Sequence, residues 1–252
     1  MRTESEVTAV DTAGKTVTVR HGEETYKESY DRLVLSPGAA PIRPAIPGIE
    51  ENKVFTLRNI PDTYRIYDHI KETAPRSCAV IGAGFIGLEM AENLAERGVH
   101  VTVVEGASHV MPPIDMDMAH QVHNYIRAQG IDLYLGQTCT AMDKDGVILK
   151  DGRKIPADMV ILSIGVRPDT GFLKDSGIEL GARGEILVNS YMETSAPDVY
   201  ALGDAASVRH IVSGKQVLDS SGFPGPISRG VLLEIISVEE KRLIGAVRVP
   251  PS

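Results

Sequence analysis

Three glycines and one glutamate have the spacing of a nucleotide-binding turn. Residues 79–105 read AVIGAGFIGLEMAENLAERGVHVTVVE: an apolar strand, the triplet Gly82, Gly84 and Gly87, a helix, and a second strand ending on Glu105. The first glycine allows a tight turn, the second lets the backbone approach a pyrophosphate, and the third lets the helix pack against the sheet. The helix N-terminus then offers unpaired N–H groups to the phosphates.

The acidic residue at the end of the second strand predicts which dinucleotide binds. A carboxylate at Glu105 accepts hydrogen bonds from ribose hydroxyls. The next residues, Gly106, Ala107 and Ser108, offer no Arg or Lys for a 2′-phosphate, so NAD(H) is favoured over NADP(H). A glycine-rich turn in an unrelated α/β domain is the alternative, and the strand, helix and acidic residue in register argue against it.

Composition excludes several classes of function. The 252 residues carry a net charge of −8, with 42% hydrophobic and 24% charged residues, which argues against a nucleic-acid partner. The sequence holds no stretch of membrane-spanning length and no signal-peptide core, so a cytoplasmic location and no membrane partner are expected. Cys78 and Cys139 are far apart and are interpreted as structural cysteines rather than as a disulfide or a catalytic thiol.

Short strands and helices should surround the glycine turn. Strands are expected within residues 5–35, followed by an extended proline-rich segment at 40–48 that crosses between units. A helix over 60–73 should be capped by Asn59 and turn Ile66, Tyr67 and Ile70 inward. A second helix is expected over 115–129, with Met118, Val122 and Ile126 as its apolar stripe. Further strands are expected at 131–135, 139–142, 146–149, 158–164 and 199–202.

Four more motifs stand in a fixed order with the glycine turn. They are LVLSPGAAP (33–41), TLRNIPDT (56–63), DMVILSIGVRPD (158–169) and EILVNSYMETSAPDVYALGD (185–204). Over residues 1–216 the chain resembles the pyridine-nucleotide–disulfide oxidoreductases. The resemblance is closest to the branch that contains coenzyme A-disulfide reductase, NADH oxidase and NADH-dependent persulfide reductase.

The resemblance implies an α/β fold in which a Rossmann-like NAD(H)-binding domain is inserted into a partial FAD-binding domain. That inserted domain should have a central parallel sheet, helices and a β-meander. The implied boundaries are 1–72 for the partial FAD-binding domain, 73–190 for the NAD(H)-binding domain, 191–216 for the return to the FAD-binding domain, and 217–252 for a tail unlike the family. In the family, hydride passes from the nicotinamide to the flavin, and electrons then pass to a cysteine or to oxygen.

The resemblance also implies roles for single residues. Gly165 would lie beside the nicotinamide and Glu89 near the nicotinamide–flavin junction, whereas Asp204 would accept hydrogen bonds from the flavin's ribityl chain. Read without the family, Gly165 is a turn glycine and Asp204 a helix cap. The NAD set is Gly82, Gly84, Phe85, Ile86, Gly87, Glu89, Glu105 and Gly165. The FAD set is Val7, Ser36, Pro37, Gly38, Gly203 and Asp204.

The chain also departs from the family pattern. It starts after the family's own FAD-binding βαβ unit, and no second glycine fingerprint lies between Met1 and Ser77. The family's redox cysteine belongs to that unit, so the chain is expected to be truncated, to lack a catalytic residue and to bind FAD weakly. Strand faces left uncovered predict self-association or poor solubility.

Two functional hypotheses follow. One is the NAD(H)-binding portion of a flavin-dependent NADH:disulfide or NADH:oxygen oxidoreductase. The other is a module that binds NAD(H), a small-molecule partner, without turnover. The electron acceptor stays open between coenzyme A disulfide, persulfide, oxygen and peroxide. No metal site is expected, because His120 and His123 are interpreted as part of a solvated helix face.

Overall fold

The chain forms two compact units. The computed structural model describes residues 2–50, 54–209, 216–218 and 243–246. Pro41–Val166 forms the inserted unit, and residues 1–40 and 167–252 form the other, called here the flanking unit. Two short strands carry the chain across these divisions, β5 (Ala39–Pro41) and β14 (Val166–Pro168), and they pair with each other.

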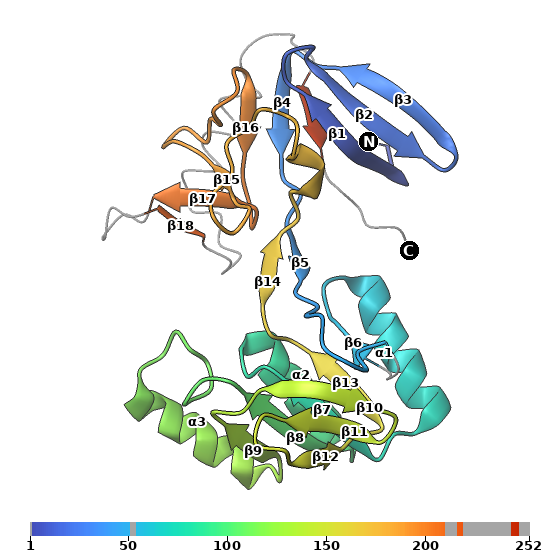
Figure 1. Ribbon diagram of the computed structural model, residues 1–252, viewed down its shortest axis with the longest axis vertical. Coiled ribbons are helices and arrows are strands. Elements are labelled where there is room, and N and C mark those ends of the chain that lie inside the picture. Colours follow the sequence, from blue (N-terminus) through green and yellow to red (C-terminus); the bar gives the residue numbers. More distant parts are fainter. Residues whose placement is uncertain (1, 51–53, 210–215, 219–242, 247–252) are drawn as a thin grey trace. The chain divides into compact units, whose positions relative to one another are not determined.

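A parallel five-stranded sheet is the centre of the inserted unit (Figure 1). Its strand order is β6-β13-β7-β8-β9, and all four ladders are parallel. The strands are β6 (Val54–Phe55), β7 (Ser77–Ile81), β8 (His100–Glu105), β9 (Asp132–Leu135) and β13 (Met159–Leu162). The helices are α1 (Ile60–Thr73), α2 (Phe85–Glu96) and α3 (Met116–Ala128). This confirms the expected α/β fold with a parallel sheet and helices.

The central strands β7 and β13 bury both faces, which is why their sequences are largely apolar. On β7, Val80 joins a core formed with the helices, in which Ala91 and Leu94 of α2 and Ile126 of α3 are buried. The alternate residue Ile81 belongs to a core on the other face. That second core is completed by a meander of β10 (Cys139–Asp143), β11 (Gly146–Leu149) and β12 (Lys154–Pro156).

The predicted bounds and cap of α1 agree with the structure, but one of the side chains predicted to face inward does not. Asn59 caps α1 in a capping box with Asp62, and Ile66 is buried as expected. Tyr67, predicted to face inward, is 54% exposed, because the buried stripe of α1 is narrow and the phenol ring remains in water.

The predicted stripe of α3 is also partly wrong. Met118 is 53% exposed, and the buried residues are Ala119, His123 and Ile126. His123 therefore lies on the packed face and not on a solvated one. Its Nε2 accepts a hydrogen bond from the Val110 N–H at 3.2 Å, which satisfies the imidazole inside the core.

The flanking unit contains three small sheets around one apolar core. One sheet is antiparallel, in the order β1-β2-β3, and the parallel sheet β16-β4-β19 carries two of the segments expected near FAD. The third has the order β15-β17-β18. The elements are β1 (Ser5–Asp11), β2 (Thr16–His21), β3 (Glu24–Ser29), β4 (Arg32–Leu35), η1 (Gly171–Leu173), β15 (Ile186–Leu187), β16 (Val199–Ala201), β17 (Ala206–Arg209), β18 (Gln216–Leu218) and β19 (Leu243–Ala246).

The units divide at different residues from the boundaries expected at 72/73 and 190/191. Residues 41–72 go with the inserted unit because β6 pairs with β13 and Ile66 packs in the helix-side core. Residues 167–190 go with the flanking unit because Leu173 and Ile186 are buried in its core. Of the expected tail, residues 219–242 and 247–252 lie outside the described part of the chain. Among the described residues, no helix is long and apolar enough to cross a membrane.

One carboxylate joins the starts of the two central strands. Asp158, directly before β13, accepts hydrogen bonds from the Arg76 N–H at 2.8 Å, the Ser77 N–H at 3.0 Å and the Ser77 hydroxyl at 3.1 Å. These donors, the Arg76 N–H foremost, lower the pKa of the Asp158 carboxyl below its usual 3.8. The ionised form is therefore stabilised by folding.

Replacing this carboxylate should reduce stability in a pH-dependent way. Asp158→Asn should lower the free energy of unfolding by about 1 kcal/mol near neutral pH, a modest value because the group is exposed. A carboxyl with a lowered folded pKa contributes above its unfolded pKa and loses that contribution as pH falls through the folded pKa. Urea unfolding at several pH values should show the difference from the unmodified chain shrink below pH 3.8. Asp68→Asn on exposed α1 is the control; an equal effect there would contradict the assignment.

Candidate dinucleotide-binding site

The turn after β7 is shaped by contacts that only glycine permits. Gly82 has φ +102, and a Cβ there would lie 2.4 Å from the Ser163 carbonyl oxygen. Its N–H donates to the Val104 carbonyl of β8 at 2.8 Å. The turn therefore passes closely over both neighbouring strands, in agreement with the tight turn predicted at this residue.

Gly87 allows α2 to approach the sheet. A Cβ at this position would lie 2.1 Å from the Gly82 carbonyl oxygen and 2.5 Å from the Ser163 hydroxyl oxygen. That hydroxyl donates to the carbonyls of Ile81 and Gly82 at 3.1 and 3.0 Å. The third glycine of the fingerprint therefore serves packing between helix and sheet, as the sequence predicted.

Gly84 differs from the other two glycines because no described residue restricts it. It is the N-cap of α2, with φ −77 and ψ −175, and a Cβ there would meet no atom within 4 Å. Alanine could adopt this backbone without strain. The space beside Gly84 is open, and a ligand is what could require the absence of a side chain there.

Glu105 holds the glycine turn and the following loop together. Its Oε2 accepts from the Ala83 N–H at 2.7 Å, and its Oε1 accepts from the Ala107 N–H at 2.8 Å. A carboxylate has about four lone-pair positions, so acceptor capacity remains for a ligand. The carboxylate is thus fixed in orientation before any ligand arrives.

These residues border a cavity of about 510 Å³, within the range of sites for small molecules and cofactors. Of the residues predicted to bind NAD, Gly82, Gly84, Glu105 and Gly165 line it. The other lining residues are Pro44, Ile46, Ile81, Val104, Gly106, Pro112, Gln137, Thr138, Cys139, Leu162, Ser163 and Ile164. Fixed acceptors, an open helix N-terminus and mostly apolar walls suit a dinucleotide.

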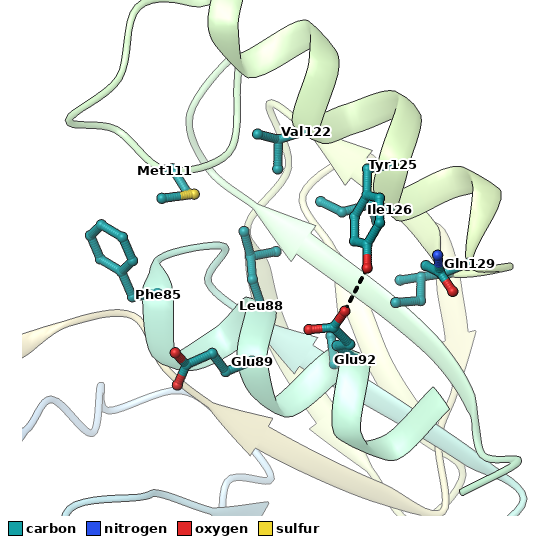
Figure 2. A pocket seen from close by; sticks show the side chains of 11 residues that line it. Phe85, Leu88, Glu89, Glu92, Met111, Val122, Tyr125, Ile126 and Gln129 are labelled. Atoms are coloured by element: carbon teal, nitrogen blue, oxygen red, sulfur yellow. Dashed lines mark hydrogen bonds between the residues drawn. The ribbon is translucent and has the colours of Figure 1, made fainter. Parts of the chain in front are cut away.

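The remaining predicted NAD residues do not line this cavity. Phe85 and Glu89 border a separate, largely apolar hollow of about 180 Å³ between α2 and α3 (Figure 2). There the Tyr125 hydroxyl donates to Glu92 Oε1 at 2.8 Å, as the dashed line in Figure 2 shows. Ile86 lines neither cavity and is 41% exposed.

Sequence reasoning missed several residues of the larger cavity. Ser163 belongs to the motif DMVILSIGVRPD (158–169), and its small polar side chain near Gly165 could have indicated a place in the site. Gln137 and Thr138 follow β9, and only the parallel pairing of β8 with β9 brings them next to Glu105. Pro44 and Ile46 come from the proline-rich crossing segment, whose path the sequence did not reveal.

The residues predicted to meet FAD lie in the flanking unit, and two of its segments come together there. The parallel strands β4 and β16 end side by side, and the Leu202 N–H donates to the Leu35 carbonyl at 3.0 Å. A Cβ on Gly203, which has φ +79, would lie 3.2 Å from the Ser36 hydroxyl oxygen. Ser36, Pro37, Gly38, Gly203 and Asp204 therefore gather at the carboxyl ends of two strands, where open α/β sheets bind ligands. Val7 belongs to β1 of another sheet, and its side chain is buried in the core.

Neither cysteine has the surroundings of a reactive thiol. Burial raises the pKa of the Cys78 thiol to about 12, and burial also raises the pKa of the Cys139 thiol. Thiolates are the nucleophilic form, and both environments disfavour it. Burial, followed by the charges of Arg127 and His120, lowers the pKa of His123. No cluster of three or more His, Cys, Asp or Glu that could hold a metal ion occurs among the described residues.

Comparison with known proteins places this geometry in a family. A family model described as pyridine nucleotide-disulphide oxidoreductase matches residues 1–220. Coenzyme A disulfide reductase of Staphylococcus aureus (strain Mu3) is 36% identical over 215 residues, which are 84% of this chain and 48% of that protein. The chain thus spans about half the length of this curated relative.

Two solved structures share the fold closely. An NAD-dependent persulfide reductase from A. fulgidus superposes with a TM-score of 0.86 at 31% identity, covering 95% of this chain and 45% of that one. The water-forming NADH oxidase from Lactobacillus brevis, solved bound to NADH, has a TM-score of 0.82 at 31% identity, covering 94% of this chain and 54% of that one. The branch that the sequence motifs indicated is thereby confirmed.

Alanine at two of the glycines should separate packing from ligand contact. Gly87→Ala should lower the melting temperature markedly, because its Cβ would meet backbone and Ser163 at under 3 Å. Gly84→Ala should change the free energy of unfolding by less than about 1 kcal/mol, since its Cβ would meet no atom of the described residues within 4 Å. Affinity for NADH should nevertheless fall at least about tenfold in Gly84→Ala, since its Cβ would occupy space needed by the pyrophosphate.

Thermal unfolding and NADH titration by fluorescence, carried out on both variants, check this expectation. Gly98→Ala tests the effect of a surface glycine at a helix end, where a Cβ meets nothing but φ is +81. Unchanged NADH affinity in Gly84→Ala would show that the cofactor phosphates do not pass this residue.

Proposed function

The chain belongs to the pyridine nucleotide-disulphide oxidoreductase family, and we propose that its Pro41–Val166 unit binds NAD(H) for hydride transfer to FAD. Members of the family bind NAD(H) and FAD. The observation that carries the proposal is the cavity in which Gly84 is open and the Glu105 carboxylate is fixed by two backbone N–H groups. The activity is that of an NADH:disulfide or NADH:oxygen oxidoreductase, with this chain as its NAD(H)-binding portion.

The described residues account for cofactor preference in this proposal. Glu105 has acceptor capacity left for ribose hydroxyls, and a 2′-phosphate would meet the same carboxylate as a like charge. Gly106, Ala107 and Ser108 supply no cation to offset that repulsion. NADH is therefore the preferred reductant over NADPH.

The proposal assigns FAD to the flanking unit. Ser36, Pro37 and Gly38 follow β4, and Gly203 and Asp204 follow β16, so both segments can face one ligand at the strand ends. Bound flavin would accept the hydride of NADH and pass electrons onward. Asp204 would orient the flavin chain by accepting hydrogen bonds from its hydroxyls, and Val7 would contribute backbone only, since its side chain is buried.

A second candidate function is NAD(H) binding without turnover. The observation that favours it is the pair of cysteines, because Cys78 has a pKa of about 12 and burial raises the pKa of Cys139 as well. Neither cysteine is suited to act as the thiolate that attacks a disulfide substrate and relays electrons to it from a reduced flavin. Under this proposal the described residues supply the dinucleotide site alone.

The visible spectrum of the purified chain distinguishes the two functions. A flavin band that persists through purification and bleaches on addition of NADH under anaerobic conditions supports hydride transfer. A colourless protein that binds NADH supports the binding module. Absence of NADH binding by calorimetry would contradict both, because each requires the cavity of the inserted unit to accept the dinucleotide.

Glu105 should govern both affinity and selectivity. Glu105→Ala should weaken NADH binding at least about tenfold, because it removes acceptors for the ribose and releases two backbone N–H groups of the loops. The preference for NADH over NADPH should narrow, since the repelling charge is lost. Competition titrations with both nucleotides measure these effects, with Glu96→Ala at the exposed end of α2 as the matched control. An NADH affinity in Glu105→Ala equal to that of the control would remove Glu105 from the site.

A further inference from the structure

Gln137 carries an unpaired acceptor at the edge of the dinucleotide cavity. The residue lines the cavity together with Glu105 and Thr138. Its side-chain oxygen Oε1 is buried and has no hydrogen-bond partner among the described residues. Buried acceptors are nearly always paired, so an unpaired one that borders a cavity requires an explanation.

Backbone hydrogen bonds fix Gln137 beside Glu105, the carboxylate expected to bind the ribose. Its N–H donates to the Glu105 carbonyl at 2.9 Å, and the preceding Gly136 N–H donates to the Ala107 carbonyl at 2.9 Å. The segment after β9 is therefore tied to the segment after β8. Only the side chain of Gln137 is left to adjust, and the terminal torsion of glutamine is soft.

We propose that Gln137 is a specificity residue whose Oε1 accepts a hydrogen bond from a donor on the adenosine half of the bound dinucleotide. The inference rests on the proposed function, since it takes NAD(H) as the occupant of the cavity. The donor is either the exocyclic amine of adenine or a ribose hydroxyl. In both cases the Gln137 carboxamide would turn towards the cavity, and its Oε1 would gain the hydrogen-bond partner that it lacks among the described residues.

Such an acceptor makes the site selective for donor groups. A pocket with an unpaired hydrogen-bonding group rejects an analogue that lacks the matching partner far more strongly than an apolar pocket does. The Glu105 carboxylate and Gln137 Oε1 together form an acceptor-rich edge of the cavity. Adenosine, with its amine and two hydroxyls, is the half of NAD(H) that would meet this edge, because Glu105 is the carboxylate expected to bind the adenosine ribose.

Analogues that lack one donor at a time test the proposal. The probes are NADH, its hypoxanthine analogue without the amine, and its 2′-deoxy and 3′-deoxy adenosine analogues. Dissociation constants are measured for the unmodified full chain and for Gln137→Leu. For each protein, the affinity lost on replacing NADH with an analogue is the ratio of the two dissociation constants. For one analogue, this ratio should be at least about fivefold larger in the unmodified chain than in Gln137→Leu. The analogue that shows this coupling identifies the donor.

Control variants keep the test decisive. Gln121→Leu, on an exposed position of α3, should leave every affinity ratio within about twofold of the unmodified chain. Gln137→Met, with a side chain of similar length, replaces Gln137→Leu if the latter does not fold. NADH binding with no coupling to any analogue overturns this inference alone. Failure of the unmodified chain to bind any of the dinucleotides overturns the proposed function as well.

Discussion

The close approach of α2 to the glycine turn is the constraint on which the site depends. Gly87 brings the helix within contact of the Gly82 carbonyl, and Ser163 ties the same carbonyl to β13. A Cβ at Gly87 would lie 2.1 Å from the Gly82 carbonyl oxygen, so a side chain there would push the helix N-terminus away from the sheet. The packing of Gly87 against the Gly82 carbonyl therefore sets the position of the helix N-terminus, where phosphates can bind.

A second constraint is the pair of hydrogen bonds by which Glu105 holds two loops of the site. The Glu105 carboxylate accepts hydrogen bonds from the Ala83 N–H in the glycine turn and the Ala107 N–H in the next loop. The same side chain therefore shapes the site and has acceptor capacity left for a ligand hydroxyl. Changing this residue alters the position of the turn as well as the charge that a 2′-phosphate would meet. Under the proposed function, cofactor preference would therefore be coupled to the conformation of two loops.

Under the proposed function, the two units have complementary roles. The inserted unit contains the cavity lined by Gly82, Gly84 and Glu105, and the flanking unit has a serine–proline–glycine turn and a glycine–aspartate turn at the ends of parallel strands. Both arrangements follow the same rule, that ligands of parallel α/β sheets bind at the carboxyl ends of the strands. The rule explains why motifs far apart in the sequence come together at the strand ends of each unit.

The sequence by itself determined the elements and the fingerprint. Continuous apolar strands, the Asn59 cap and the spacing of the glycines to Glu105 are local features, so the parallel sheet and the core of the site were predictable. Tertiary structure alone decided which side chains are buried and what lies beside the fingerprint. Tyr67 and His123 show the first limit, because helix periodicity does not say how wide a face the sheet covers. Gln137 shows the second, because its place beside Glu105 comes from the pairing of β8 with β9, a contact between residues far apart in the chain.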